Sequence, residues 1–171
     1  DADVVIDLNG LNITSGHRCF VLKKGATLSV LDFNGAGKVT GKGGKDWSGG
    51  VIYGEGACTV NIYGGTYTYT SIADSHVAAG GVIYAVAGSK VNIHGGSFDG
   101  SAFDYTTEGC TGGTVYQAHS AGTFTMSAGY FKGGKAYSTG TMFIGGKTNT
   151  VTITGGILTG GYAAKNVGNL Y

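Results

Sequence analysis

A seven-residue phrase recurs along this chain and constrains its fold more than any other feature. Residues 59–65 read Thr-Val-Asn-Ile-Tyr-Gly-Gly, and residues 90–96 and 150–156 keep the Val, Ile and Gly-Gly positions. Apolar and polar residues alternate within the phrase, which is the period of a β-strand rather than of a helix. The closing glycines are typical of a turn. The phrase therefore predicts a short strand followed by a sharp change of direction.

A second phrase recurs at a similar interval. Gly-Gly-Val-Ile-Tyr stands at 49–53 and 80–84, and Gly-Gly-Thr-Val-Tyr stands at 112–116. Looser copies extend the first phrase to six repeats, whose apolar marker residues lie 22 to 33 residues apart. These markers are Leu8, Val30, Ile62, Ile93, Met126 and Ile153.

Each repeat has room for three short strands and three corners. The marker strand comes first, and two further strands follow it before the next repeat. A single repeat of this kind cannot bury its own apolar face, so repeats stack and cover one another. The sequence therefore predicts an all-β fold, a parallel β-solenoid of about six rungs. The inward positions of the second strand are Ile13, Val39, Tyr67, Phe98, Phe131 and Leu158, and those of the third are Phe20, Ile52, Ile83, Val115, Met142 and Leu170.

The composition is that of one packed β-solenoid domain spanning residues 1–171. Gly accounts for 35 residues, but Pro is absent, so the chain is not collagen-like. Hydrophobic residues make up 42% and the net charge is +1, which excludes the composition of a disordered chain. We expect neither nucleic-acid binding nor membrane insertion, because there is no basic run and no long apolar stretch. Only 12% of residues are charged, and a polar, uncharged surface indicates a secreted or cell-surface protein.

The two phrases, x-Val-x-Ile-x-Gly-Gly and Gly-Gly-x-Ile-Tyr, resemble those of the right-handed parallel β-helix of the pectate-lyase-like superfamily. Their residue pattern is most similar to that of adhesin-like bacterial surface proteins with Gly-Gly repeats. The resemblance covers nearly the whole chain and implies the fold and its right-handed coil. It does not imply one activity, because this fold carries lyases, hydrolases, adhesins and phage spikes.

Catalytic chemistry on such a scaffold requires clustered charged residues on one outer face. Calcium would need six to eight oxygen ligands, and the outward row of the first strand holds one carboxylate, Asp7. His94 could act as a base that Asp99 orients. The alternative is that His94 is a solvated residue of the ladder and Asp99 a turn residue. We therefore expect no enzyme activity, no metal and no cofactor.

The longest connections run from 68 to 82 and from 99 to 114, and insertions on one face of a solenoid often form its binding surface. A small acid or metal site there is one interpretation, and plain surface loops or a subunit contact is the other. The candidate residues of this loop face are Trp47, Asp74, His76, Asp104, Tyr105 and Glu108.

The third strand predicts a stripe of outward aromatic side chains on five consecutive rungs. Rings that stack at the spacing between strands stabilise one another. An exposed stripe also indicates contact with a partner such as a glycan or a protein surface. Both interpretations remain open at this point. The stripe comprises Tyr53, Tyr84, Tyr116, Phe143 and Tyr171.

Two smaller signals concern the chain's surroundings. Cys19, Cys58 and Cys110 have unrelated spacings, which favours small buried residues or free thiols over a disulfide framework. Asn12-Ile13-Thr14 is an N-glycosylation sequon, and Asn12 should point outward.

The predicted solenoid shows no polar cap at either end, and an uncapped rung exposes strand edges and core. Self-association, end to end or lateral, would cover these edges. The sequence therefore predicts an extracellular structural or adhesive β-solenoid, either a subunit of a head-to-tail filament or part of a longer protein. The alternative is a carbohydrate-binding or polysaccharide-active β-helix, such as a lyase or hydrolase.

Overall fold

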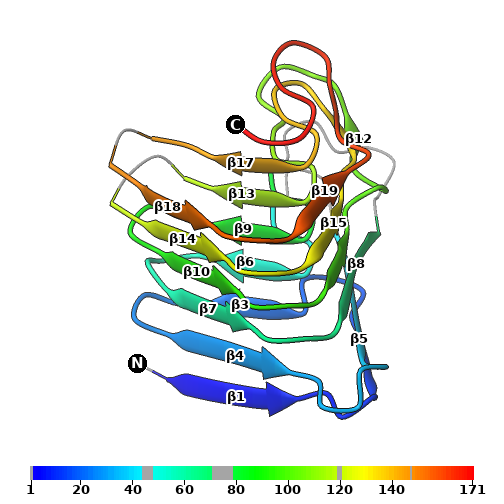
Figure 1. Cartoon of the computed structure of the whole chain (residues 1–171), viewed down its shortest axis with the longest axis vertical. Coiled ribbons are helices and arrows are strands. Elements are labelled where there is room, and N and C mark those ends of the chain that lie inside the picture. Colours follow the sequence, from blue (N-terminus) through cyan, green and yellow to red (C-terminus); the bar gives the residue numbers. More distant parts are fainter. Residues whose placement is uncertain (1, 44–47, 71–78, 119–120, 147) are drawn as a thin grey trace.

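A computed structural model of the chain describes residues 2–43, 48–70, 79–118, 121–146 and 148–171. These residues form a parallel β-solenoid and include no helix (Figure 1). The chain coils upward from its N-terminus at one end of the stack to its C-terminus at the other, and each strand pairs in parallel with its counterpart one turn away. The predicted all-β solenoid is therefore confirmed.

Three long sheets and one short sheet form the walls. The first sheet contains β1 (Asp3–Asp7), β4 (Thr27–Leu31), β7 (Thr59–Ile62), β10 (Lys90–Ile93), β14 (Thr123–Met126) and β18 (Thr150–Ile153). The second contains β2 (Asn12–Thr14), β5 (Lys38–Lys42), β8 (Thr66–Thr70), β11 (Ser97–Asp99), β15 (Tyr130–Lys132) and β19 (Ile157–Thr159). The third contains β3 (Phe20–Leu22), β6 (Ile52–Gly54), β9 (Ile83–Ala85), β13 (Val115–Gln117) and β17 (Met142–Ile144).

The short fourth sheet was not predicted. It pairs β12 (Asp104–Tyr105), β16 (Lys135–Ala136) and β20 (Tyr162–Ala163) beside the last three turns. These turns use part of the connection between the second and third sheets as an extra strand. The two-residue strands are too short to show an alternating pattern in the sequence.

The number of turns that are stacked on both sides is smaller than the predicted six rungs. About four turns are packed between neighbours on both sides, and the first and last turns are each covered on one side only. The burial pattern reflects this difference, because inward residues of β7 and β10 are buried whereas all four residues of β18 are exposed.

Inward side chains form continuous ladders of like residues. Val60 pairs with Val91, and the same column continues through Phe124 to Val151. On the second sheet, the rings of Tyr67, Phe98 and Phe131 stack with centroids 4.9 Å and 4.3 Å apart. These rings are fully buried. Each turn therefore buries its apolar face against the next turn, as the repeat predicts.

The register of the first turn corrects one prediction. Ile6, rather than Leu8, pairs with Val30 and occupies the marker column. Leu8 is also buried, but it lies beyond the end of β1 at the corner. A shift of two residues keeps a side chain on the same face of a strand, so alternation alone does not fix this register. The outward row therefore begins with Val5 and not with Asp7.

Glycines allow close backbone packing between turns where the second sheet leads towards the third. A Cβ atom on Gly113 would lie 2.1 Å from the carbonyl oxygen of Gly140 in the next turn. A Cβ atom on Gly81 would lie 2.5 Å from the carbonyl oxygen of Gly113. No side chain fits at that approach, so the Gly-Gly pairs of the second phrase mark direct backbone packing between turns.

The inward ladder predicts that Ile93→Asp strongly destabilises the fold. The substitution would bury an unpaired carboxylate among apolar side chains, so the free energy of unfolding should fall by roughly 4 kcal/mol or more. Lys90→Asp, on the exposed face of the same strand, should change it by less than about 0.5 kcal/mol. Urea unfolding followed by circular dichroism measures both. Equal stability of the two variants would contradict the inward position of Ile93.

The glycine contact predicts a cost of about 1–3 kcal/mol for Gly113→Ala, because the added methyl group must displace backbone. Gly16→Ala is the matched control, since its Cβ atom would meet nothing within 4 Å. The control should unfold at the parent's urea midpoint or slightly above it. If both variants unfold together, the tight approach is not a constraint on the fold.

Candidate functional site

The predicted aromatic stripe is a stacked ladder on the outer face of the third sheet. Successive centroids from Tyr53 to Tyr171 lie 5.2, 5.1, 5.2 and 5.2 Å apart. The rings are nearly parallel, with interplanar angles of 20° or less. Parallel pairing of β6, β9, β13 and β17, continued by the bridge between Met142 and Leu170, sets this spacing, because equivalent residues stand one strand apart.

Most ring faces in this ladder are already occupied. Each inner ring has a neighbouring ring on both faces, and the guanidinium carbon of Arg18 lies 3.9 Å from the ring centroid of Tyr53. Arg18 is itself fixed by its Nε, which donates to the carbonyl oxygen of Ser48 at 2.9 Å. Phe143 is buried, whereas Tyr171 is 59% exposed. A sugar ring stacks on an aromatic face, so this geometry favours a stabilising ladder over a glycan platform along its length.

The ladder also perturbs the acidity of its tyrosines. Burial raises the pKa of Tyr84, and the neighbouring Tyr53 raises it further. Burial likewise raises the pKa of Tyr116, together with the neighbouring Tyr84. A phenolate at either position would be poorly solvated, so both hydroxyl groups stay protonated well into the alkaline range.

Of the six loop-face residues, the structure describes Asp104, Tyr105 and Glu108, and these three have different surroundings. Trp47, Asp74 and His76 lie outside the described residues. Asp104 accepts a hydrogen bond at 2.9 Å from the Nζ of Lys135 on the next turn, and Glu108 is exposed.

Tyr105 corrects the loop-face hypothesis. It belongs to β12 and is buried, with its ring edge-on to Phe103 at 4.9 Å. It is therefore part of the core, where the fourth sheet folds its side chain inward, and it is not available to a ligand.

His94 and Asp99 have different partners. The carboxylate of Asp99 accepts hydrogen bonds from Ser101 and lies 3.6 Å from the Nζ of Lys132. Burial opposes its ionisation, but these contacts prevail and lower the pKa of Asp99. The imidazole of His94 instead stacks on the Tyr63 ring, with centroids 4.8 Å apart, and its Nδ1 lies 3.5 Å from Ser127 Oγ. The base and orienting pair considered from sequence is thus not formed.

A polar ladder on the first sheet was missed from sequence as a connected unit. Asn61 Nδ2 donates to Ser29 Oγ at 3.0 Å, and Asn92 Nδ2 donates to Asn61 Oδ1 at 2.9 Å. Thr125 continues the series by donating to Asn92 Oδ1. The signal was present in the outward row of Ser, Asn and Thr, but only the register shows that they bind one another.

The part of the chain that the structure describes shows neither a metal site nor an activated cysteine. Among the described ranges, no group of three His, Cys, Asp or Glu side chains could hold a metal ion. Cys19 and Cys58 are free thiols, and burial raises the pKa of Cys19 to about 11, which makes it a poor nucleophile. Cys110 is fully buried. The described part of the chain also contains no helix capable of crossing a membrane.

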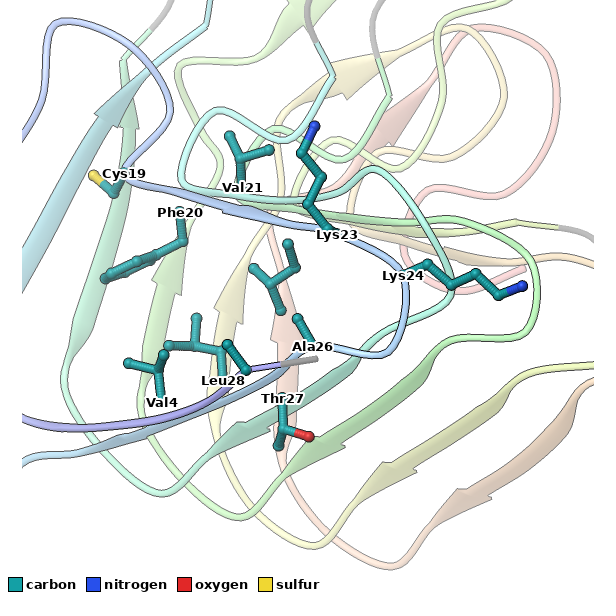
Figure 2. Close-up of a pocket in the computed structure, with 11 residues that line it drawn as sticks. Val4, Cys19, Phe20, Val21, Lys23, Lys24, Ala26, Thr27 and Leu28 are labelled. Atoms are coloured by element: carbon teal, nitrogen blue, oxygen red, sulfur yellow. The ribbon is translucent and has the colours of Figure 1, made fainter.

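One hollow of about 470 Å³ opens beneath the first turn (Figure 2). Val4 of β1, Phe20 of β3 and Leu28 of β4 contribute its apolar wall. The side chains of Lys23 and Lys24 extend away from this wall. The hollow is the exposed end of the core and holds no catalytic grouping.

The sequon lies on an outer surface. Asn12 and Thr14 are both exposed at the two ends of β2, while Ile13 between them is partly buried. Glycosylation at Asn12 stays a prediction.

Comparisons with protein-family models, with curated proteins and with solved structures found no match to this chain.

The ladder predicts an alkaline loss of stability that depends on its hydroxyl groups. The pKa values of Tyr84 and Tyr116 are raised in the folded protein, so the contribution of these tyrosines to the free energy of unfolding is fully present below the unfolded-chain pKa of about 10. That contribution is lost as the pH rises through the folded-state pKa values. The double variant Tyr84→Phe/Tyr116→Phe keeps the rings, so its stability should match the parent near neutral pH and fall less between about pH 9 and about pH 11.

Tyr84→Ala is the contrasting variant, because it removes two stacked pairs that each contribute about 0.5–1.5 kcal/mol beyond area burial. It should be destabilised already near neutral pH. Thermal melts across the pH range test both effects, and an alanine variant as stable as the parent would show that the ladder does not hold the turns together.

Proposed function

We propose that this chain is an extracellular or cell-surface β-solenoid with a structural or adhesive role. The observation that carries the proposal is the continuity of its ladders from turn to turn. Buried apolar columns lie inside, and an aromatic ladder and a hydrogen-bonded polar ladder lie on two outer faces. Such a coil resists local opening, because each turn is held on several sides at once.

The surface supports this proposal. The exposed residues include Thr, Ser, Asn and Tyr, and the few described ion pairs lie on the solvent side. Only 12% of the residues of the chain are charged, and a rigid surface of low charge suits contact with other surfaces outside the cell. Membership of the pectate-lyase-like superfamily, with a likeness to adhesin-like surface proteins, is part of the same proposal and rests on the repeated phrases.

The arrangement of the acidic residues supports a non-enzymatic role. Asp99 is engaged by Ser101 and Lys132, and Asp104 by Lys135. A general acid or base requires a carboxyl group within reach of a bound substrate and with a matched pKa.

Carbohydrate binding is the second candidate, and the exposed ring of Tyr171 favours it, since this ring has one neighbour in the ladder rather than two. A glycan array probed with the parent and with Tyr171→Ala separates the two candidates. Binding that is lost in the variant would support a carbohydrate-binding module.

The proposed role is tested by displaying the chain on bacterial cells and measuring their attachment to host cells and extracellular matrix. Display of the parent should increase attachment, or stiffen the displayed layer, relative to the destabilised Ile93→Asp variant. Equal behaviour of the two strains in both measurements would remove support for a structural or adhesive role.

The same proposal predicts no turnover of pectin, alginate or related polymers. Incubation with the purified protein should release neither new reducing ends nor unsaturated products. Turnover that disappears in Asp74→Ala, His76→Ala, Asp104→Ala or Glu108→Ala proteins with unchanged melting curves would overturn it and place an active site on the loop face.

A further inference from the structure

We propose that the outer tyrosines of the third sheet are a site of oxidative cross-linking, at which Tyr84 becomes covalently joined to Tyr53 or to Tyr116. The reaction is the coupling of two phenol rings into dityrosine, and its co-reactant is a one-electron oxidant in the surrounding solution. The inference goes beyond the proposed function, because it concerns the chemistry of these side chains and holds for a structural, an adhesive or a carbohydrate-binding protein alike.

The backbone holds the three tyrosines in one column. Tyr84 of β9 pairs in parallel with Tyr53 of β6 and with Tyr116 of β13, and these strands lie one above another in the third sheet (Figure 1). Neighbouring strands stand about 4.8 Å apart, and equivalent side chains leave the sheet on the same face. The residues on both sides of each tyrosine in its strand are buried, which anchors the column to the core.

The rings of each pair lie face to face. Their centroids are 5.2 Å apart for Tyr53 and Tyr84 and 5.1 Å apart for Tyr84 and Tyr116, with interplanar angles of 20° and 10°. Coupling requires that a ring carbon ortho to each hydroxyl group move together from this stacked arrangement. Rotation about the side-chain torsions provides that movement, so the two phenols need not meet by diffusion.

The neighbours of the column decide which pairs can couple. The ring of Phe143 stacks on Tyr116 with centroids 5.2 Å apart, but it carries no hydroxyl group and forms no phenoxyl radical. On the other side, the guanidinium carbon of Arg18 lies 3.9 Å from the ring centroid of Tyr53 and covers that face. Tyr84 has a phenol against each face, so every coupled pair in this column contains Tyr84.

The column is also within reach of an oxidant. Tyr53, Tyr84 and Tyr116 are each half-buried, so part of every ring meets solvent. The stacked rings of Tyr67 and Phe98 inside the coil are fully buried by comparison. The outer ladder therefore combines a fixed pair geometry with access for a small molecule.

Two one-electron oxidations and one bond formation account for the reaction. Tyr84 and one neighbour each lose an electron to the oxidant and the phenolic proton to water, which leaves two phenoxyl radicals. A carbon–carbon bond then forms between one ortho carbon of each ring. The hydrogen on each of these carbons is transferred as a proton to the ring oxygen, which restores both phenols. Two electrons and two protons leave the protein in total, so the product is lighter than the parent by two hydrogen atoms.

The geometry favours coupling within one chain over coupling between chains. Groups that are held next to each other react as an intramolecular pair, and the effective concentration of such a pair exceeds any concentration of the protein. The yield of the cross-link should therefore stay constant when the protein is diluted. The new bond joins adjacent turns of the coil.

The test uses photogenerated tris(bipyridine)ruthenium(III) as the oxidant, with persulfate as the final electron acceptor. The sequence contains two glutamates, Glu55 and Glu108, so complete cleavage after glutamate in the denatured chain places Tyr53, Tyr84 and Tyr116 in three different fragments. A cross-link at Tyr84 joins the middle fragment to one of the other two. Mass spectrometry detects the joined fragments and the loss of two hydrogen atoms, and fragmentation spectra locate the bond.

Tyr84→Phe and Tyr63→Phe are matched variants, since each removes one hydroxyl group and keeps the ring. Tyr63 is 50% exposed, and its ring stacks on His94 rather than on a phenol. The parent and Tyr63→Phe should give joined fragments from monomeric protein in equal yield across a dilution series. Tyr84→Phe should lower that yield at least about tenfold, because the remaining phenols have no phenol beside them in the column. Circular dichroism melts confirm that each variant is folded.

A parent that gives no joined fragments, under irradiation that couples free tyrosine, would overturn the proposal. Equal yields from the parent and Tyr84→Phe would also overturn it, since the bond would then lie elsewhere. The same holds for a yield that Tyr63→Phe abolishes, and for cross-links that occur only in dimers and disappear on dilution.

Discussion

The stacking of equivalent residues in parallel register is the interaction on which the rest of this structure depends. A strand of three to five residues buries little by itself, and no turn has a core of its own. Burial appears when Val91 lies between Val60 and Phe124, or Phe98 between Tyr67 and Phe131. Stability is therefore shared between neighbouring turns, and it is lowest at the two turns that have one neighbour.

The same register determines what the outer surface can do. A side chain that points outward stands next to its equivalents above and below, so outward residues interact first with one another. Asn61 and Asn92 use hydrogen-bonding groups along the axis, and Tyr84 has a ring on both faces. Rows that look like free binding groups in the sequence are partly satisfied in the fold. The outward rows therefore favour stabilisation of the stack along its axis over ligand binding along its sides.

Backbone packing adds a second constraint. Gly81, Gly113 and Gly140 let successive turns approach at a point where any side chain would collide with a carbonyl group. The Gly-Gly phrases are thus required because the backbones of successive turns pack directly against one another there. Their recurrence explains why the chain is rich in Gly without being collagen-like.

The sequence by itself determined the strands of the three long sheets, most of their inward residues and the parallel stack, because alternation with a period of two and a repeat near 30 residues follow from local patterns. Only the tertiary structure decided the rest. It chose Ile6 over Leu8, since a shift of two residues preserves the buried face. It buried Tyr105, because a two-residue strand in a long connection carries no readable pattern. It also placed the rings of Tyr53 and Tyr116 against the two faces of the Tyr84 ring. The orientation of a side chain depends on neighbours one turn away, which are distant in sequence.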